Sequence, residues 1–115
     1  PSKVRKIYIL GTQTMSQVHH MVLLKFKPEV SDTAIAEVLQ KVEGLKQSIP
    51  GIDYFSSGAY SSPEGFNKGF THGFLTTFTH PEARDRYLSH PDHESVKNAL
   101  FAIIEDAVAF DFIAE

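Results

Sequence analysis

The chain has 115 residues, of which 42% are hydrophobic and 22% charged, and its formal net charge is -3. This length and balance predict one globular domain with a real core, and the negative charge gives no reason to expect a nucleic-acid partner. Cysteine is absent, which excludes disulfides and thiolate metal sites and fits a cytoplasmic protein. No apolar run reaches the ~20 residues of a membrane-spanning helix, so we expect no membrane partner.

Residues 1–14 differ in character from the rest of the chain. They contain three basic residues and no acidic one, and Met15 follows them directly. We interpret them as an N-terminal extension or an appended arm, and residues 15–115 as the domain. The apolar residues 7–10 are too few for the apolar region of a signal peptide, but they could add an edge strand.

The first strand is predicted over residues 18–27. Its alternate residues Val18, His20, Val22, Leu24 and Phe26 share one face, which is apolar except for the histidine. The opposite face is also apolar in the middle. This pattern indicates that both faces of the strand are covered.

A helix is predicted over residues 31–48, because apolar residues recur there at three- and four-residue steps. Ser31 or Asp32 can cap its amino end, and a Pro-Gly pair ends it. A weaker strand over residues 53–60 follows. Residues 61–69 are loop by composition, and we interpret them as a surface loop rather than as a gate over a pocket.

The third strand is predicted over residues 70–79. A second helix then begins at Pro81 and stops near His90, because the residue before a proline avoids helical angles. Asp92 is expected to cap a third helix that extends to Ile103 and Ile104. The last strand is predicted over residues 107–113.

The order β-α-β-β-α-α-β is that of a ferredoxin-like α+β fold with an antiparallel four-stranded sheet. Its helices cover one face of the sheet, and no chain remains to cover the other apolar face. We therefore expect a homodimer through the sheet faces, which forms a dimeric α/β barrel.

Four segments, residues 18–27, 69–74, 87–93 and 110–112, resemble the stress-responsive dimeric A/B barrel (Dabb) family. The resemblance extends over residues 17–114, and it implies the same dimeric barrel. Most members have no assigned reaction, but a plant member is a polyketide cyclase that closes a ring by intramolecular aldol condensation. The resemblance places its catalytic tyrosine and histidine at Tyr87 and His93.

The same resemblance places a neighbouring aspartate of the cyclase at Asp111 and its pocket histidines at His20 and His72. A second pocket tyrosine of the cyclase falls on Val42, so the shape of the pocket must differ. We expect a ligand pocket between sheet and helices, and its predicted lining residues are His20, His72, Leu24, Phe26, Val42 and Phe74.

The chemistry of this cluster allows two interpretations. A neutral His93 could remove a proton next to a carbonyl, Tyr87 could stabilise the resulting oxyanion, and Asp111 could fix the imidazole tautomer. Alternatively, the histidine is a first-turn helix residue and the tyrosine only packs its ring.

Two classes of function follow. The first is a stress-associated dimer that binds a small apolar or phenolic ligand without an assignable reaction. The alternative is a polyketide cyclase-like enzyme that performs aldol or Claisen-type ring closure. A haem or oxidase role ranks third.

No cofactor is expected, and nothing suggests a nucleotide, because no glycine-rich phosphate loop precedes a helix. No transition-metal site is expected either, because Pro91 breaks the helix that would align His90 with His93. Magnesium held by carbonyls at the dimer interface stays open as an alternative.

Overall fold

The computed structural model describes residues 9–10, 13–14 and 16–115. Its first two strands, β1 (Ile9–Leu10) and β2 (Gln13–Thr14), pair with each other in antiparallel fashion and not with the main sheet. The interpretation of residues 1–14 as an extension lies largely outside the described residues and stays a prediction.

The main sheet contains β3 (Val18–Phe26), β4 (Ile52–Ala59), β5 (His72–Phe78) and β6 (Ile104–Ile113). Their order across the sheet is β4-β5-β3-β6, and every neighbouring pair is antiparallel. This arrangement confirms the predicted ferredoxin-like α+β fold.

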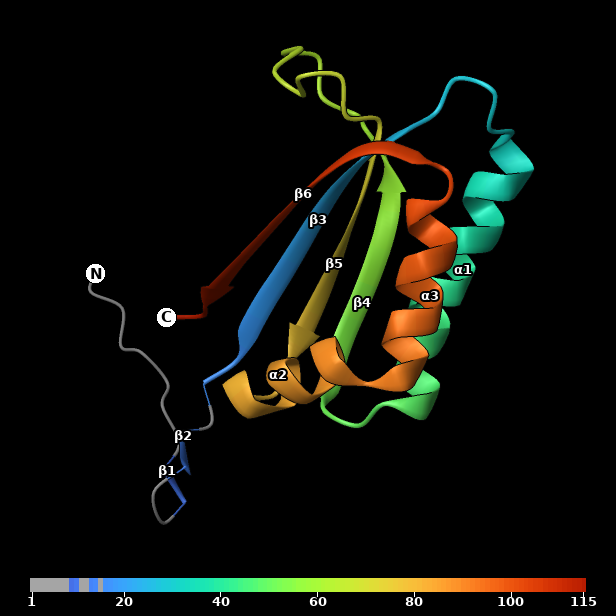
Figure 1. The fold of residues 1–115 in the computed structure, drawn as a ribbon. Coiled ribbons are helices and arrows are strands. Elements are labelled where there is room, and N and C mark those ends of the chain that lie inside the picture. Colours follow the sequence, from blue (N-terminus) through green and yellow to red (C-terminus); the bar gives the residue numbers. More distant parts are fainter. Residues whose placement is uncertain (1–8, 11–12, 15) are drawn as a thin grey trace.

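Three helices, α1 (Asp32–Ser48), α2 (Pro81–Ser89) and α3 (Pro91–Phe101), complete the domain. Figure 1 shows α1 and α3 side by side against one face of the sheet, with α2 near the end of β5. Among the described residues, no helix combines the length and apolarity that a bilayer span requires.

The helix starts follow side-chain capping, and one predicted cap is wrong. Ser31 caps α1 and His80 caps α2, each by accepting a hydrogen bond from the backbone N–H three residues later. For α3 the cap is His90, whose Nδ1 accepts from the N–H of Asp92 at 3.0 Å. Because Pro91 takes the first helical position, the capping residue must precede it, so Asp92 lies inside the first turn.

The predicted length of the third helix is also wrong. The helix ends at Phe101, and Ile104 is already the first residue of β6. The N–H of Lys27 donates to the carbonyl of Ile103 at 3.0 Å, and Phe26 pairs with Ile104. Pairing with β3 therefore draws these two isoleucines out of the helical pattern.

The two faces of the sheet have opposite surroundings. The inner face packs on the helices and confirms the predicted alternation in β3, since Val18, His20, Val22, Leu24 and Phe26 are all buried. The outer face is uncovered in the single chain. Its large apolar side chains, all at least 39% exposed, include Met21, Leu23, Val108, Phe110 and Phe112.

Candidate functional site

A pocket of about 190 Å³ lies between the inner face of the sheet and the helices. We call it the inner pocket. Its walls come from β3, β5 and β6 on one side and from all three helices on the other, and they are almost entirely apolar. Six of the predicted site residues line it together: His20, Leu24, Val42, Phe74, Tyr87 and His93.

Tyr87 supplies the buried phenol of this pocket. It lies in the last turn of α2 with 2% of its surface exposed, and its ring packs edge-on against Phe78 at 4.8 Å between centroids. Burial raises the pKa of the hydroxyl to about 12. The phenol therefore stays protonated at neutral pH and can donate a hydrogen bond into the pocket.

His93 faces this tyrosine from the first turns of α3, and the two ring centroids are 4.6 Å apart. Burial lowers the pKa of His93, and the nearby His20 and Lys97 lower it further. The backbone of Leu88 and the carboxylate of Glu94 oppose this shift without reversing it. The imidazole is therefore neutral at neutral pH, as a general base must be.

One ring nitrogen of His93 has no partner. Its Nδ1 is buried and accepts or donates no hydrogen bond among the described residues. An unsatisfied buried polar atom costs about 1–3 kcal/mol, and such atoms in folded proteins call for an explanation. In an otherwise apolar pocket, this nitrogen is suited to a polar group of a ligand.

Asp111 does not support His93, contrary to expectation. Its Oδ1 lies 2.6 Å from Nδ1 of His20, and its Oδ2 accepts from Nη1 of Arg84 at 2.8 Å. The aspartate on β6 thus fixes the orientation of the histidine on β3, which leaves Nε2 of His20 as the nitrogen that can meet a ligand. Arg84 was not predicted, because it lies 27 positions from Asp111 and no local pattern joins them.

His72 and Phe26 are not part of the inner pocket. Their rings meet edge-to-face, with 5.4 Å between the ring centroids. His72 on β5 is the pairing partner of Leu24 on β3. Four of the six predicted lining residues therefore come together, and these two pack further along the same face.

Nine of the fifteen lining residues were not predicted as site residues: Val22, Leu45, Leu88, Val96, Lys97, Leu100, Phe101, Ala107 and Ala109. Lys97 had a usable signal, because it follows His93 by four positions and so shares its side of the helix. Leu88 and Phe101 looked like ordinary surface residues at helix ends.

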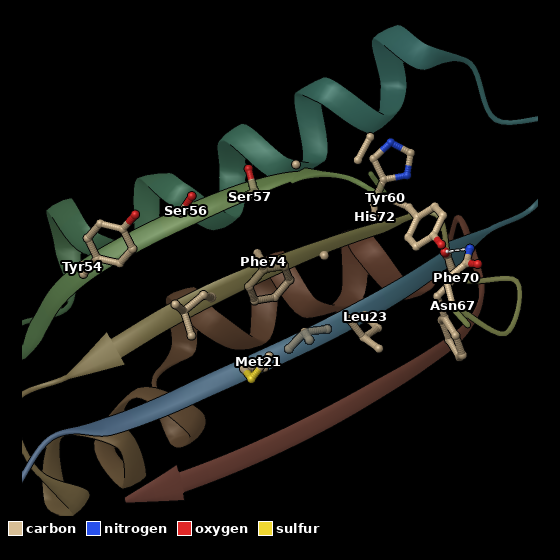
Figure 2. Close-up of a pocket in the computed structure, with 15 residues that line it drawn as sticks. Met21, Leu23, Tyr54, Ser56, Ser57, Tyr60, Asn67, Phe70, His72 and Phe74 are labelled. Atoms are coloured by element: carbon tan, nitrogen blue, oxygen red, sulfur yellow. Dashed lines mark hydrogen bonds between the residues drawn. The ribbon is translucent and has the colours of Figure 1, made fainter. Parts of the chain in front are cut away.

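A second, wider hollow of about 510 Å³ lies over β4, β5 and β3, and Figure 2 shows the residues around it. We call it the outer hollow. It is open to solvent and is lined by apolar and small residues such as Met21, Leu23, Tyr54, Gly58 and Gly73. Gly58 and Gly73 are direct neighbours across β4 and β5, and their lack of side chains deepens the hollow at that point.

Within the described residues, no group of three or more His, Asp or Glu side chains could hold a metal ion. His90 is used as a helix cap, so it does not join His93 in a metal site. The expectation that the protein has no resident metal stays a prediction.

The comparisons with known proteins give the family. The model of the Stress responsive A/B Barrel Domain (Dabb) family matches residues 18–114. The chain belongs to this family. A stress-response A/B barrel domain-containing protein of Arabidopsis thaliana is 34% identical to it over 94 residues, which are 81% of this chain and 82% of the relative.

Two further matches bear on activity and assembly. Olivetolic acid cyclase of Cannabis sativa is 26% identical over 95 residues, which are 83% of this chain and 94% of the cyclase. The crystal structure of a dimeric ferredoxin-like protein of unknown function from Jannaschia sp. is 28% identical, with a TM-score of 0.75. That match covers 84% of this chain and 97% of the other.

In this Dabb domain, the helix break at His90–Pro91 creates the site. Because α2 ends and α3 begins there, Tyr87 in one helix and His93 in the next face each other across the turn. In an unbroken helix these two residues, six positions apart, would point to different sides.

Proposed function

We propose that this Dabb domain binds a small apolar or phenolic ligand in the inner pocket. The observation that carries the proposal is the combination of apolar walls with three converging polar side chains, His20, Tyr87 and His93. A concave apolar site with few polar groups is the usual form of a small-molecule site. The unpaired Nδ1 of His93 and the phenol of Tyr87 fit a ligand that presents a carbonyl or hydroxyl group.

Filling the pocket tests this proposal. Ala107→Leu adds three carbons to a lining residue on β6, so it should abolish binding of phenolic ligands measured by NMR titration. The matched control is Ala99→Leu, which makes the same change at a partly buried position outside the pocket lining. Ala99→Leu should bind like the wild type, and ligand binding that survives in Ala107→Leu would contradict the inner pocket as the site.

A second candidate function is ring closure of a linear polyketide. It is favoured by the pairing of a neutral His93 with a protonated Tyr87 and by the similarity to olivetolic acid cyclase. In this mechanism the imidazole removes a proton from a carbon next to a carbonyl. The resulting enolate carbon attacks a second carbonyl of the same chain, and a carbon–carbon bond forms while that carbonyl becomes an alkoxide.

The two side chains then complete the step. The phenol of Tyr87 donates a hydrogen bond to the oxygen on which negative charge develops, and the imidazolium of His93 returns its proton to the alkoxide. Loss of water from the aldol product gives the ring its double bond. Val42 occupies the position of a pocket tyrosine in the cyclase, so we expect this protein to accept polyketides of a different length from the substrate of the cyclase.

We infer in addition that two copies pair through the outer face of the sheet. The face is apolar and uncovered, and the similar Jannaschia protein is described as dimeric. A two-fold axis parallel to the strands sets β6 of one copy over β4 of the other. Phe110, which is 61% exposed on the β6 edge, then meets the hollow over Gly58 and Gly73 of the partner subunit.

A further inference from the structure

We propose that the ligand of the inner pocket is a small carboxylic acid, with its apolar body in the pocket and its carboxylate on Lys97. The inference rests on the proposed ligand-binding function and names the chemical class of the ligand. It assigns a role in ligand specificity to Lys97, a residue that was neither predicted as part of the site nor placed there by the family resemblance.

The position of Lys97 follows from the helix. His93, Val96, Lys97 and Leu100 are spaced three and four residues apart in α3, so they form one stripe, and all four line the inner pocket. Leu100 is buried, whereas the side chain of Lys97 is 37% exposed. The ammonium group therefore lies where the pocket opens to solvent.

The surroundings of this lysine are apolar. Leu88 and Phe101, which also line the pocket, are 43% and 56% exposed, and Nζ of Lys97 lies 5.9 Å from the centre of the Phe101 ring. No other lining residue carries a permanent charge. An apolar opening with a single cation is complementary to an apolar molecule that ends in a single anionic group.

Lys97 follows His93 by four positions in α3, and both side chains line the inner pocket. One small ligand can therefore contact both, and Lys97 also contributes to the lowered pKa of His93.

Lys97 already has a carboxylate partner, and that partner is replaceable. Its Nζ lies 3.2 Å from Oε1 of Glu94, whose side chain is 55% exposed and outside the pocket lining. Exposed pairs of this kind contribute little, because water solvates both charges well. A ligand carboxylate can therefore take the place of Glu94 without breaking a buried bond.

The competing interpretation is that Lys97 only covers Phe101 with its methylene groups and leaves its charge in water. The two interpretations differ in one measurable property. Covering an aromatic ring requires no particular ligand charge, whereas a carboxylate site discriminates between an acid and its neutral amide.

The test compares 4-methylbenzoate with 4-methylbenzamide, which have the same shape and differ in charge. Dissociation constants come from NMR titration at low ionic strength. We expect the wild-type protein to bind the acid about fivefold to tenfold more tightly than the amide. Lys97→Gln should remove that preference and leave binding of the amide unchanged, and Glu94→Gln should increase the preference.

The matched control is Lys46→Gln. Lys46 forms the same kind of pair with Glu43, also at 3.2 Å and three residues apart, but it lies on α1 outside the pocket lining. Equal binding of acid and amide by the wild-type protein overturns the role of Lys97 and leaves the pocket proposal standing. A preference that Lys97→Gln retains has the same meaning, whereas binding of neither compound overturns the proposed function as well.

Discussion

The two faces of the sheet carry two different kinds of apolar surface. The inner face is closed by helices, and its pocket contains a few polar groups whose pKa values burial has changed. The outer face has a larger hollow built from glycines and exposed apolar side chains. This difference supports the proposals of a small-molecule ligand at the inner face and of a second protein chain at the outer face.

The largest expected effect concerns the inner face. If the domain closes polyketide rings, His93→Gln should lower the rate by about 10²–10⁴-fold, because the general base is lost. The measurement is product formation from a linear polyketide acid, followed by mass spectrometry. The control is His90→Asn, which changes the neighbouring histidine to another good helix cap and should leave the rate within about twofold. Equal losses in both variants would show that the helix break, and not the imidazole, is responsible.

The next effect concerns the outer face. Gly58 has no atom within 4 Å of the place where a side chain would begin, so Gly58→Leu fits the single chain without a clash. In the proposed dimer the leucine would occupy the space that receives the partner, and we expect the dimer dissociation constant to rise about 10²-fold or more. Analytical ultracentrifugation measures it.

Gly44→Leu is the control for this prediction. It makes the same change on α1, where an added Cβ also has no atom within 4 Å, and Gly44 lies outside the lining of the outer hollow. A Gly58→Leu protein that stays as dimeric as the wild type, with an unchanged melting temperature, would mean that the outer hollow is not covered by a second copy.

Local patterns in the sequence predicted most of the fold. The alternation in β3, the apolar stripe of α1 and the prolines at the first positions of α2 and α3 specified the element order, because each signal acts within a few residues. The predictions were wrong where contacts between residues far apart in the sequence determine the structure. Ile103 and Ile104 continue the helical spacing of α3, but their contacts with Lys27 and Phe26 place Ile103 in a turn and Ile104 at the start of β6.

In the candidate site, too, local signals were interpreted correctly and long-range contacts were not. The family resemblance placed Tyr87 and His93 in the site, and a single helix break brings them together, whereas the contact of Asp111 with His20 joins residues 91 positions apart. No spacing rule connects such positions, and the aspartate was therefore assigned to the wrong histidine. The role of Arg84 as its second partner depends on how α2 packs beside β6, which the local sequence does not encode.

Disrupting the contacts of Asp111 with His20 and Arg84 should have a moderate effect on the stability of the domain. Asp111→Asn keeps the shape of the side chain but removes the charge that pairs with Arg84 and His20, and these groups are about three-quarters or more buried. We expect the free energy of unfolding to fall by about 1–3 kcal/mol, measured by urea denaturation. Asp85→Asn is the control, since its carboxylate also contacts Arg84 at 2.8 Å but is 66% exposed. A loss below about 0.5 kcal/mol is expected there, and similar losses in both variants would contradict the structural role of Asp111.

The smallest expected effect is the pH dependence of stability that His93 causes. Because burial lowers its pKa in the folded protein, the unfolded chain takes up a proton first as the pH falls. The contribution of the neutral imidazole is therefore complete above the unfolded pKa of about 6.5 and is lost as the pH falls toward the folded value. Urea denaturation of the wild type and of His93→Gln, from about pH 8 down to about pH 5, isolates this contribution as the difference between the two curves. The wild-type free energy of unfolding should decline more steeply below about pH 6.5 than that of the variant. Parallel curves would show that the imidazole is as well solvated in the folded protein as in the unfolded chain, and the inner face would then lose the neutral base that distinguishes it from the outer one.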